Sequence, residues 1–127
     1  MREFRVTVLD QPGQLALVSA ALSQKLVNIR SLASVSAAGP LITFISDDEE
    51  RARAALLELN LQFEEAEALS TTLSNRPGEL ANLTERLAEA SINLNSIYVL
   101  STHGGQIEIA FTVSNLPKAK QLLGALG

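Results

Sequence analysis

At 127 residues, the chain is long enough for one ordinary domain or two very small ones, and its 46% hydrophobic and 19% charged residues exclude a disordered or fibrous protein. Ten scattered Lys and Arg residues against fourteen Asp and Glu exclude an electrostatic footprint for nucleic acid, and the lack of cysteine excludes disulfides, thiolate zinc sites and cysteine nucleophiles. No apolar run approaches the ~20 residues needed to span a bilayer and no signal-peptide region is present, so we expect a cytoplasmic protein that contacts neither membrane nor nucleic acid.

The first half of the chain switches between strand and helix periods. Apolar residues at every second position are typical of half-buried strands, and apolar residues three and four apart form one side of a helix. In chain order, these patterns predict a strand through Phe4, Val6 and Val8, a helix with Leu15, Val18, Leu22 and Leu26 on one side, strands at about 27–37 and 41–46, a helix that begins at Asp47, and a strand through Leu61 and Phe63. Glu50, three residues after Asp47, completes a predicted capping box.

The second half repeats the first at a shift of 65 residues. Asp10-Gln-Pro-Gly-Gln-Leu-Ala16 superposes on Asn75-Arg-Pro-Gly-Glu-Leu-Ala81, and the same shift places Asn28 on Asn93. The repeat therefore predicts a strand through Leu69, Thr71 and Leu73, a helix with Leu80, Leu83 and Leu87 on one side, strands at about 92–102 and 106–113, and a helix that begins near Ser114. Self-similarity of this kind indicates a duplicated unit.

The predicted order β-α-β-β-α-β is that of a ferredoxin-like, α+β fold, with two helices on one face of an antiparallel sheet. We therefore expect two tandem units, residues 1–66 and 67–127, the second of which lacks its fourth strand. No Gly or Pro interrupts residues 61–74, and their apolar side chains keep one phase. The last strand of the first unit should thus run almost directly into the first strand of the second.

Each unit carries one motif, Asp10-Gln11-Pro12-Gly13-Gln14-Leu15 with Val27-Asn28-Ile29, and Asn75-Arg76-Pro77-Gly78-Glu79-Leu80 with Ile92-Asn93-Leu94. The motif resembles that of the ACT domain, here as a tandem pair that spans nearly the whole chain. The resemblance implies a stand-alone regulatory protein that binds an amino acid. The second unit is similar to the serine-sensing regulatory domain of phosphoglycerate dehydrogenase, in which the corresponding asparagines contact serine. Leu73 replaces that domain's contacting histidine, so the resemblance does not specify serine.

The motif also suits an amino acid on physical grounds. A glycine after proline permits a tight turn without a Cβ in a ligand's path, and the first amides of the following helix suit a carboxylate. Asparagine offers donors and an acceptor for the head group. The predicted ligand-binding residues are Asp10, Gln11, Gly13, Gln14, Leu15, Asn28 and Ile29 in the first unit, and Asn75, Arg76, Gly78, Glu79, Leu80, Asn93 and Leu94 in the second. Asp10 would attract an ammonium and repel a carboxylate, so the two sites should differ in preference.

Two functional interpretations stay open. One is a non-catalytic sensor that binds an amino acid and regulates amino-acid metabolism, with no cofactor or metal. The other is a ligand-free interaction module or the regulatory subunit of an enzyme, in which Pro-Gly only makes the turn and each asparagine caps backbone locally. No catalytic spacing supports an enzyme. His103 is expected to lie in a solvated hairpin tip. The acidic run from Asp47 to Glu50 is expected to begin a helix, where it favours the helix dipole, rather than to bind a metal. Tyr98 either packs in the core or lines a site.

The absent fourth strand predicts an open edge along residues 68–74. Such an edge exposes backbone N–H and C=O groups and invites pairing with another strand. This edge carries neither a charge nor a proline to discourage such pairing. Pairing within the chain or with the same edge of a second copy would cover it, and we expect the second route, a homodimer with two-fold symmetry.

Overall fold

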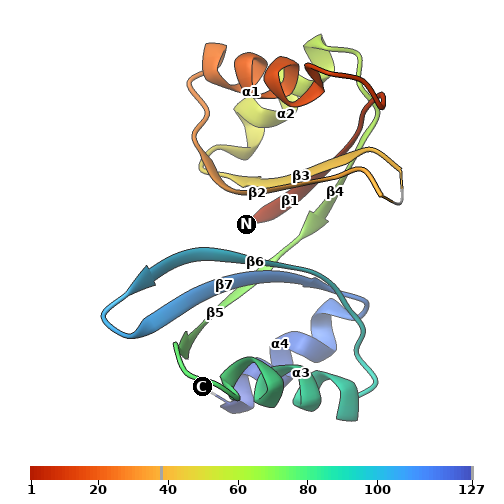
Figure 1. The fold of residues 1–127 in the computed structure, drawn as a ribbon. Coiled ribbons are helices and arrows are strands. Elements are labelled where there is room, and N and C mark those ends of the chain that lie inside the picture. Colours follow the sequence, from red (N-terminus) through yellow and green to blue (C-terminus); the bar gives the residue numbers. More distant parts are fainter. Residues whose placement is uncertain (38, 127) are drawn as a thin grey trace. The chain divides into compact units, whose positions relative to one another are not determined.

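The computed structural model describes residues 1–37 and 39–126, and their contacts divide the chain into two compact units, Met1–Ala66 and Glu67–Gly127 (Figure 1). Both units contain the element order β-α-β-β-α, and the first adds one more strand. Each has an antiparallel sheet with its helices on one face. The predicted class, two tandem ferredoxin-like units, is confirmed.

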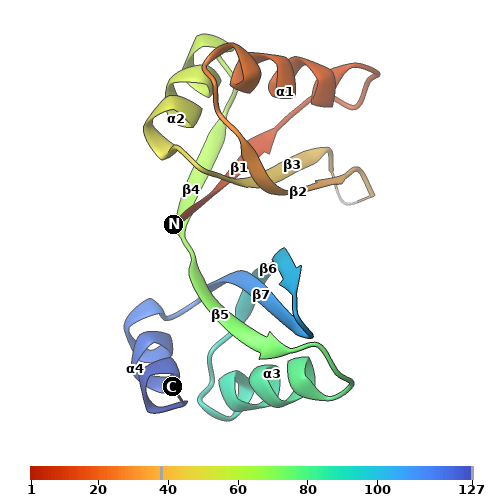
Figure 2. The same cartoon turned by 90° about the vertical axis from the view of Figure 1, so that its left-hand side faces the viewer.

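The first unit is a four-stranded sheet with the strand order β2-β3-β1-β4 (Figure 2). Its elements are β1 (Arg2–Thr7), α1 (Gln14–Gln24), β2 (Ile29–Val35), β3 (Leu41–Ser46), α2 (Glu49–Glu58) and β4 (Phe63–Glu67). Phe4 and Phe44 stack in the core with ring centroids 5.3 Å apart. Leu22 from α1 and Leu56 from α2 are buried in the same cluster. The apolar side of each helix therefore covers the apolar side of the sheet, as the two hydrophobic periods require.

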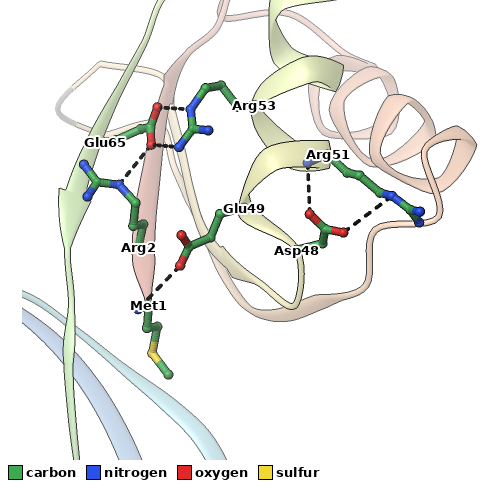
Figure 3. A network of polar contacts seen from close by, with 7 residues as sticks. All are labelled: Met1, Arg2, Asp48, Glu49, Arg51, Arg53 and Glu65. Atoms are coloured by element: carbon green, nitrogen blue, oxygen red, sulfur yellow. Dashed lines mark hydrogen bonds and ion pairs between the residues drawn. The ribbon is translucent and has the colours of Figure 1, made fainter.

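Ion pairs connect α2 with β1 and β4 (Figure 3). Arg53 on α2 donates from Nε and Nη2 to the two carboxylate oxygens of Glu65, at 2.7 and 2.6 Å. Arg2 on β1 donates from Nε to the same carboxylate at 3.0 Å. The hydrogen bonds from Arg53 hold the pKa of the Glu65 carboxyl below its ordinary value. A single carboxylate on β4 thus links three elements of the unit.

The second unit is a three-stranded sheet with the strand order β5-β7-β6. Its elements are β5 (Leu69–Ser74), α3 (Glu79–Glu89), β6 (Leu94–His103), β7 (Gln106–Val113) and α4 (Leu116–Leu126). Leu83 and Leu87 from α3 pack with Ile109 and Phe111 from β7 to form the core. Among the described residues no fourth strand joins this sheet, so β5 is an edge strand.

The boundary between the units agrees with the predicted continuous strand. β4 ends at Glu67 and β5 begins at Leu69, with only Ala68 between them. This prediction is confirmed. By contrast, β2 and β6 both begin two residues later than expected, because the residues ahead of them belong to the connections from the preceding helices.

The start of α2 differs from the prediction. The N-cap is Asp48, whose side chain accepts a hydrogen bond from the Arg51 backbone N–H at 3.1 Å. Asp47 Oδ1 instead accepts from the backbone N–H of Asn28 at 2.9 Å. The predicted capping box of Asp47 and Glu50 is therefore wrong, because the connection that leads into β2 already engages the Asp47 carboxylate.

Candidate ligand-binding site

The Pro-Gly pair makes the same turn after β1 and after β5. Gly13 and Gly78 have φ angles of 91° and 93°, in the left-handed region that favours glycine. A Cβ built at either position would meet no heavy atom within 4 Å. Glycine is therefore required here by the backbone conformation, and the space beside each turn is open.

Both turns lead into a helix that begins without a side-chain cap. Gly13 is the N-cap of α1 and Gly78 the N-cap of α3. Because the first amides of a helix have no intrahelical acceptor, those of Leu80 and Ala81 present donors at the positive end of the helix dipole, whereas the Glu79 N–H donates to the Arg76 carbonyl at 3.4 Å. Such a group is suited to a carboxylate.

A pocket of about 190 Å³ lies beside the turn of the second unit. Its rim is polar and is formed by the predicted residues Asn75, Arg76 and Glu79, together with Ser74. Its floor is aliphatic and is formed by Leu73, Leu80, Ile97, Val99, Ile107 and Ile109. Tyr98, which is buried, also contributes to the wall. The turn and the sheet thus combine polar groups with an apolar surface in one small cavity.

The charges on this rim are paired. Arg76 donates from Nε and Nη2 to Glu79 Oε1, at 3.1 and 2.6 Å. The Arg76 side chain is 70% exposed and that of Glu79 23% exposed, so the guanidinium remains accessible while the Glu79 side chain is largely covered. Asn75 is exposed and its backbone N–H donates to the Gly105 carbonyl at 2.8 Å, which fixes the turn against the β6–β7 hairpin. One positive and one negative group therefore border the cavity.

The first unit has a pocket of about 230 Å³ at the equivalent turn. It brings together most of the predicted residues of that unit with residues at the end of β2, and it is lined by Asp10, Gln11, Gly13, Gln14 and Leu15 together with Ser34, Val35 and Ser36. The Gln14 side chain accepts a hydrogen bond from the Leu9 backbone N–H at 3.1 Å. This pocket is the more polar of the two, since Asp10 stands where the second unit has Asn75 and Ser34 where it has Val99.

Asn28 and Asn93 are held alike through their backbones. The Asn28 N–H donates to Asp47 Oδ1 at 2.9 Å, and the Asp47 N–H donates to the Asn28 carbonyl at 3.1 Å. In the second unit, Ser114 Oγ accepts from the Asn93 N–H at 2.9 Å, and the Ser114 N–H donates to the Asn93 carbonyl at 2.9 Å. Both asparagines are exposed, so this local arrangement leaves their side chains at the surface.

The structure does not bring Asn93 to the turn of its own unit. Ser74, next to Asn75, pairs with Gln106, whereas Leu94, next to Asn93, pairs with Val113. These partners are the first and last residues of β7, and at a rise of about 3.3 Å per residue they lie about 23 Å apart. One amino acid cannot span that distance, so the expectation that it touches Asn75 and Asn93 of the same unit is wrong. The first unit separates its turn from Asn28 in the same way, at opposite ends of β3.

Two further predicted residues serve the cores. Ile29 and Leu94 are partly buried and pack against the core clusters of their units. Apart from Leu80, the residues of the aliphatic floor are not among the predicted site residues. Its signal was present in the apolar alternation at positions 97 and 99 and at positions 107 and 109, which was interpreted only as strand packing.

The remaining candidates have local roles. His103 is exposed at the end of β6. Within the acidic run, Asp47 and Asp48 accept backbone hydrogen bonds and Glu49 pairs with the N-terminal ammonium at 3.4 Å. In residues 1–37 and 39–126, no group of three or more His, Cys, Asp or Glu side chains is arranged to hold a metal ion. None of the helices in those ranges combines the length and apolar character needed to cross a membrane.

The fold has counterparts among solved structures. No family model and no curated protein matches the chain. A protein from Bacteroides thetaiotaomicron is similar over 98% of this chain and 86% of its own, with 18% identity and a TM-score of 0.86. The ligand-free regulatory subunit of aspartate kinase from Thermus thermophilus is similar over 98% of this chain and 89% of its own, with 16% identity and a TM-score of 0.69. The regulatory subunit of aspartate kinase from Thermus flavus is similar over 98% of this chain and 88% of its own, with 17% identity and a TM-score of 0.66. These likenesses show the fold, a tandem pair of ferredoxin-like units.

Proposed function

We propose that this protein is a non-catalytic sensor that binds a small amino acid at the β5–α3 turn and regulates amino-acid metabolism. One observation carries the proposal: the turn joins an uncapped helix start, a paired rim of opposite charges and a small aliphatic cavity in the second unit. The fold shared with regulatory subunits of aspartate kinase supports a regulatory role. The regulated partner is then an enzyme or a regulator of amino-acid metabolism in the cytoplasm.

The head group of the ligand matches the polar rim. A carboxylate would accept hydrogen bonds from the backbone N–H groups at the start of α3, around Leu80, and lie near the exposed Arg76 guanidinium. An ammonium would face the Glu79 carboxylate and the Asn75 side chain, which offers an acceptor. Both charges of a zwitterion then have partners of opposite sign, as a small-molecule site with a few convergent polar groups requires.

Asn93 takes part in this site only from a neighbouring unit, because it lies at the other end of β7 from Asn75. We propose that a second copy of the chain supplies it. A two-fold dimer would place the Asn75 end of one copy beside the Asn93 end of the other and form two identical sites. The edge strand β5 offers backbone groups for such an association.

A thermal-shift screen of the proteinogenic amino acids tests the proposal. A ligand that binds only the folded state, at a hundred times its Kd, stabilises that state by about 2.7 kcal/mol. For a domain of this size the melting temperature should rise by roughly 5–15 °C. If none of the amino acids shifts the melting temperature at millimolar concentration, the sensor proposal fails and a ligand-free interaction module, favoured by the exposed Ile97 and Val99, takes its place.

A further inference from the structure

The pocket of the second unit also indicates which amino acids it accepts, an inference that rests on the proposed function. We infer that this pocket selects an amino acid with a branched aliphatic side chain: valine, leucine or isoleucine. The volume of about 190 Å³ is well below the roughly 300–1,000 Å³ of pockets for drug-sized ligands. It is therefore suited to one small side chain with its head group at the rim.

The sheet places the floor residues on one face. Leu73 pairs with Ile107, and Ile109 pairs with Val99, so the side chains of each pair lie on the same side of the sheet. Ile109 belongs to the core cluster beneath α3, which identifies this side as the one that faces the helices. The floor is thus an extension of the apolar core toward the turn.

Part of this apolar surface faces water. Val99 is 53% exposed, Leu80 49% and Ile97 40%, and all three line the same cavity as the buried Ile109. Removing apolar surface from water is favourable in proportion to its area. A bound aliphatic side chain would cover these three residues together, and it would gain apolar contact on its own surface as well.

A polar or charged side chain finds no partner on this floor. The six floor residues are all aliphatic, and the charged groups of the pocket, Arg76 and Glu79, lie at the rim and pair with each other. A buried hydroxyl, carboxylate or ammonium without a hydrogen-bond partner is unfavourable. The same cavity that favours leucine therefore disfavours serine, aspartate and lysine.

The first unit lacks this selectivity. Ser34 occupies the position that corresponds to Val99, and Asp10 the position that corresponds to Asn75. Both line the pocket of the first unit, together with Ser36 and Gln11. Aliphatic residues such as Val35 and Ile42 also line this pocket, but a hydrophobic side chain placed there would cover hydroxyl and carboxylate groups as well as methyl groups. The aliphatic ligand should therefore occupy the second unit of each chain.

Isothermal titration of the full-length chain with L-valine, L-leucine and L-isoleucine, and with L-serine, L-aspartate and L-lysine, tests the inference. We expect at least one aliphatic amino acid to bind more tightly than all three polar ones. Val99→Ser, which introduces the residue of the first unit, should weaken that binding by about tenfold, the usual effect of a lost methyl contact in an apolar pocket. Leu57→Ser is the matched control, because Leu57 is 60% exposed on α2 and lines neither pocket.

The outcomes separate this inference from the proposed function. Tighter binding of a polar amino acid, or unchanged aliphatic binding in Val99→Ser, overturns the aliphatic selectivity and leaves the sensor proposal standing. A complete absence of heat and of any thermal shift with all amino acids overturns both. Equal weakening by Val99→Ser and Leu57→Ser also overturns the inference, since the loss would then not come from the pocket.

Discussion

Asn75 and Asn93 lie beside opposite ends of β7, whose first and last residues are about 23 Å apart at a rise of about 3.3 Å per residue. The separation follows from topology. β5 and β6 both run antiparallel to β7, so they are parallel to each other, and the end of β5 and the start of β6 lie at opposite ends of the sheet. A site that uses both asparagines must therefore combine two units.

A complementation experiment follows from this separation. Asn75→Ala and Asn93→Ala should each weaken amino-acid binding by about fivefold to tenfold, because each removes a hydrogen bond to the head group. If the asparagines of one site come from two copies, a dimer that contains one copy of each variant keeps one intact site. When equal amounts of the two variants are refolded together, about half of the dimers are mixed, so tight binding should return at about a quarter of the normal number of sites.

The control for this experiment is either variant refolded with a tagged copy of itself, which restores nothing. Failure of the mixed sample to regain tight binding, although it forms mixed dimers, would show that the two side chains do not share a ligand. If Asn93→Ala changes the affinity for the amino acid by less than twofold, Asn93 is not part of the site.

The turn glycine gives a prediction for stability. Gly78→Ala places a Cβ on a backbone with a φ of 93° and should lower the free energy of unfolding by about 1–2 kcal/mol. Beyond the two neighbouring residues in the chain, no heavy atom lies within 4 Å of the added Cβ, so the loss comes from the backbone conformation. Gly124→Ala is the matched control: it lies within α4 and has equal space, and should leave stability unchanged or raise it by up to about 1 kcal/mol. Urea denaturation of both variants measures these changes in the free energy of unfolding. An equal change in Gly78→Ala and Gly124→Ala would contradict the prediction.

The same residues show what the sequence could and could not predict. The hydrophobic periods and the repeated Pro-Gly motif correctly predicted two ferredoxin-like units and the nearly continuous strand around Ala68. They also placed Asp10 and Gln14 at one turn, where both line the same pocket. Such features depend on neighbours in sequence, because the period of a strand or helix and the φ angle of a turn glycine are local properties.

The errors arose where residues far apart in sequence had to be placed together. The capping role went to Asp48 because Asp47 was engaged by the backbone of Asn28, nineteen residues away. The aliphatic floor depends on the register of β6 and β7 and on the incomplete cover of their helix-facing side, and neither can be read from an alternating pattern. The position of Asn93, however, could have been deduced from the parallel direction of the first two strands in the predicted fold.

The Arg53–Glu65 pair predicts how stability depends on pH. Hydrogen bonds from Arg53 lower the pKa of Glu65 in the folded state below its value in the unfolded chain. The stabilisation is therefore complete above the unfolded pKa and is lost as the pH falls through the folded pKa. Glu65→Gln should reduce the free energy of unfolding at pH 7, and its difference from the parent chain should shrink as the pH falls below 4.

Glu64→Gln is the control for this pair, since it makes the same change one residue earlier on β4, at an exposed side chain. Urea midpoints for the parent chain and both variants between pH 3 and pH 7 measure the effect. A Glu65→Gln deficit that is constant with pH would show that packing rather than the charge of Glu65 stabilises this unit.

The final prediction concerns assembly through β5. Within the described residues β5 is an edge strand, and Thr72 on it is exposed, so a lysine at this position should disfavour pairing with another edge. We expect the parent chain to form a dimer of twice 13.6 kDa in light scattering at micromolar concentration, and Thr72→Lys to shift it toward the monomer. Thr102→Lys makes the same change on the other edge strand, β6, and should leave the dimer intact. If Thr102→Lys alone dissociates the dimer, the interface lies at β6 instead of β5. A constant mass near 13.6 kDa for the parent chain would exclude the dimer and, with it, the site shared by Asn75 and Asn93.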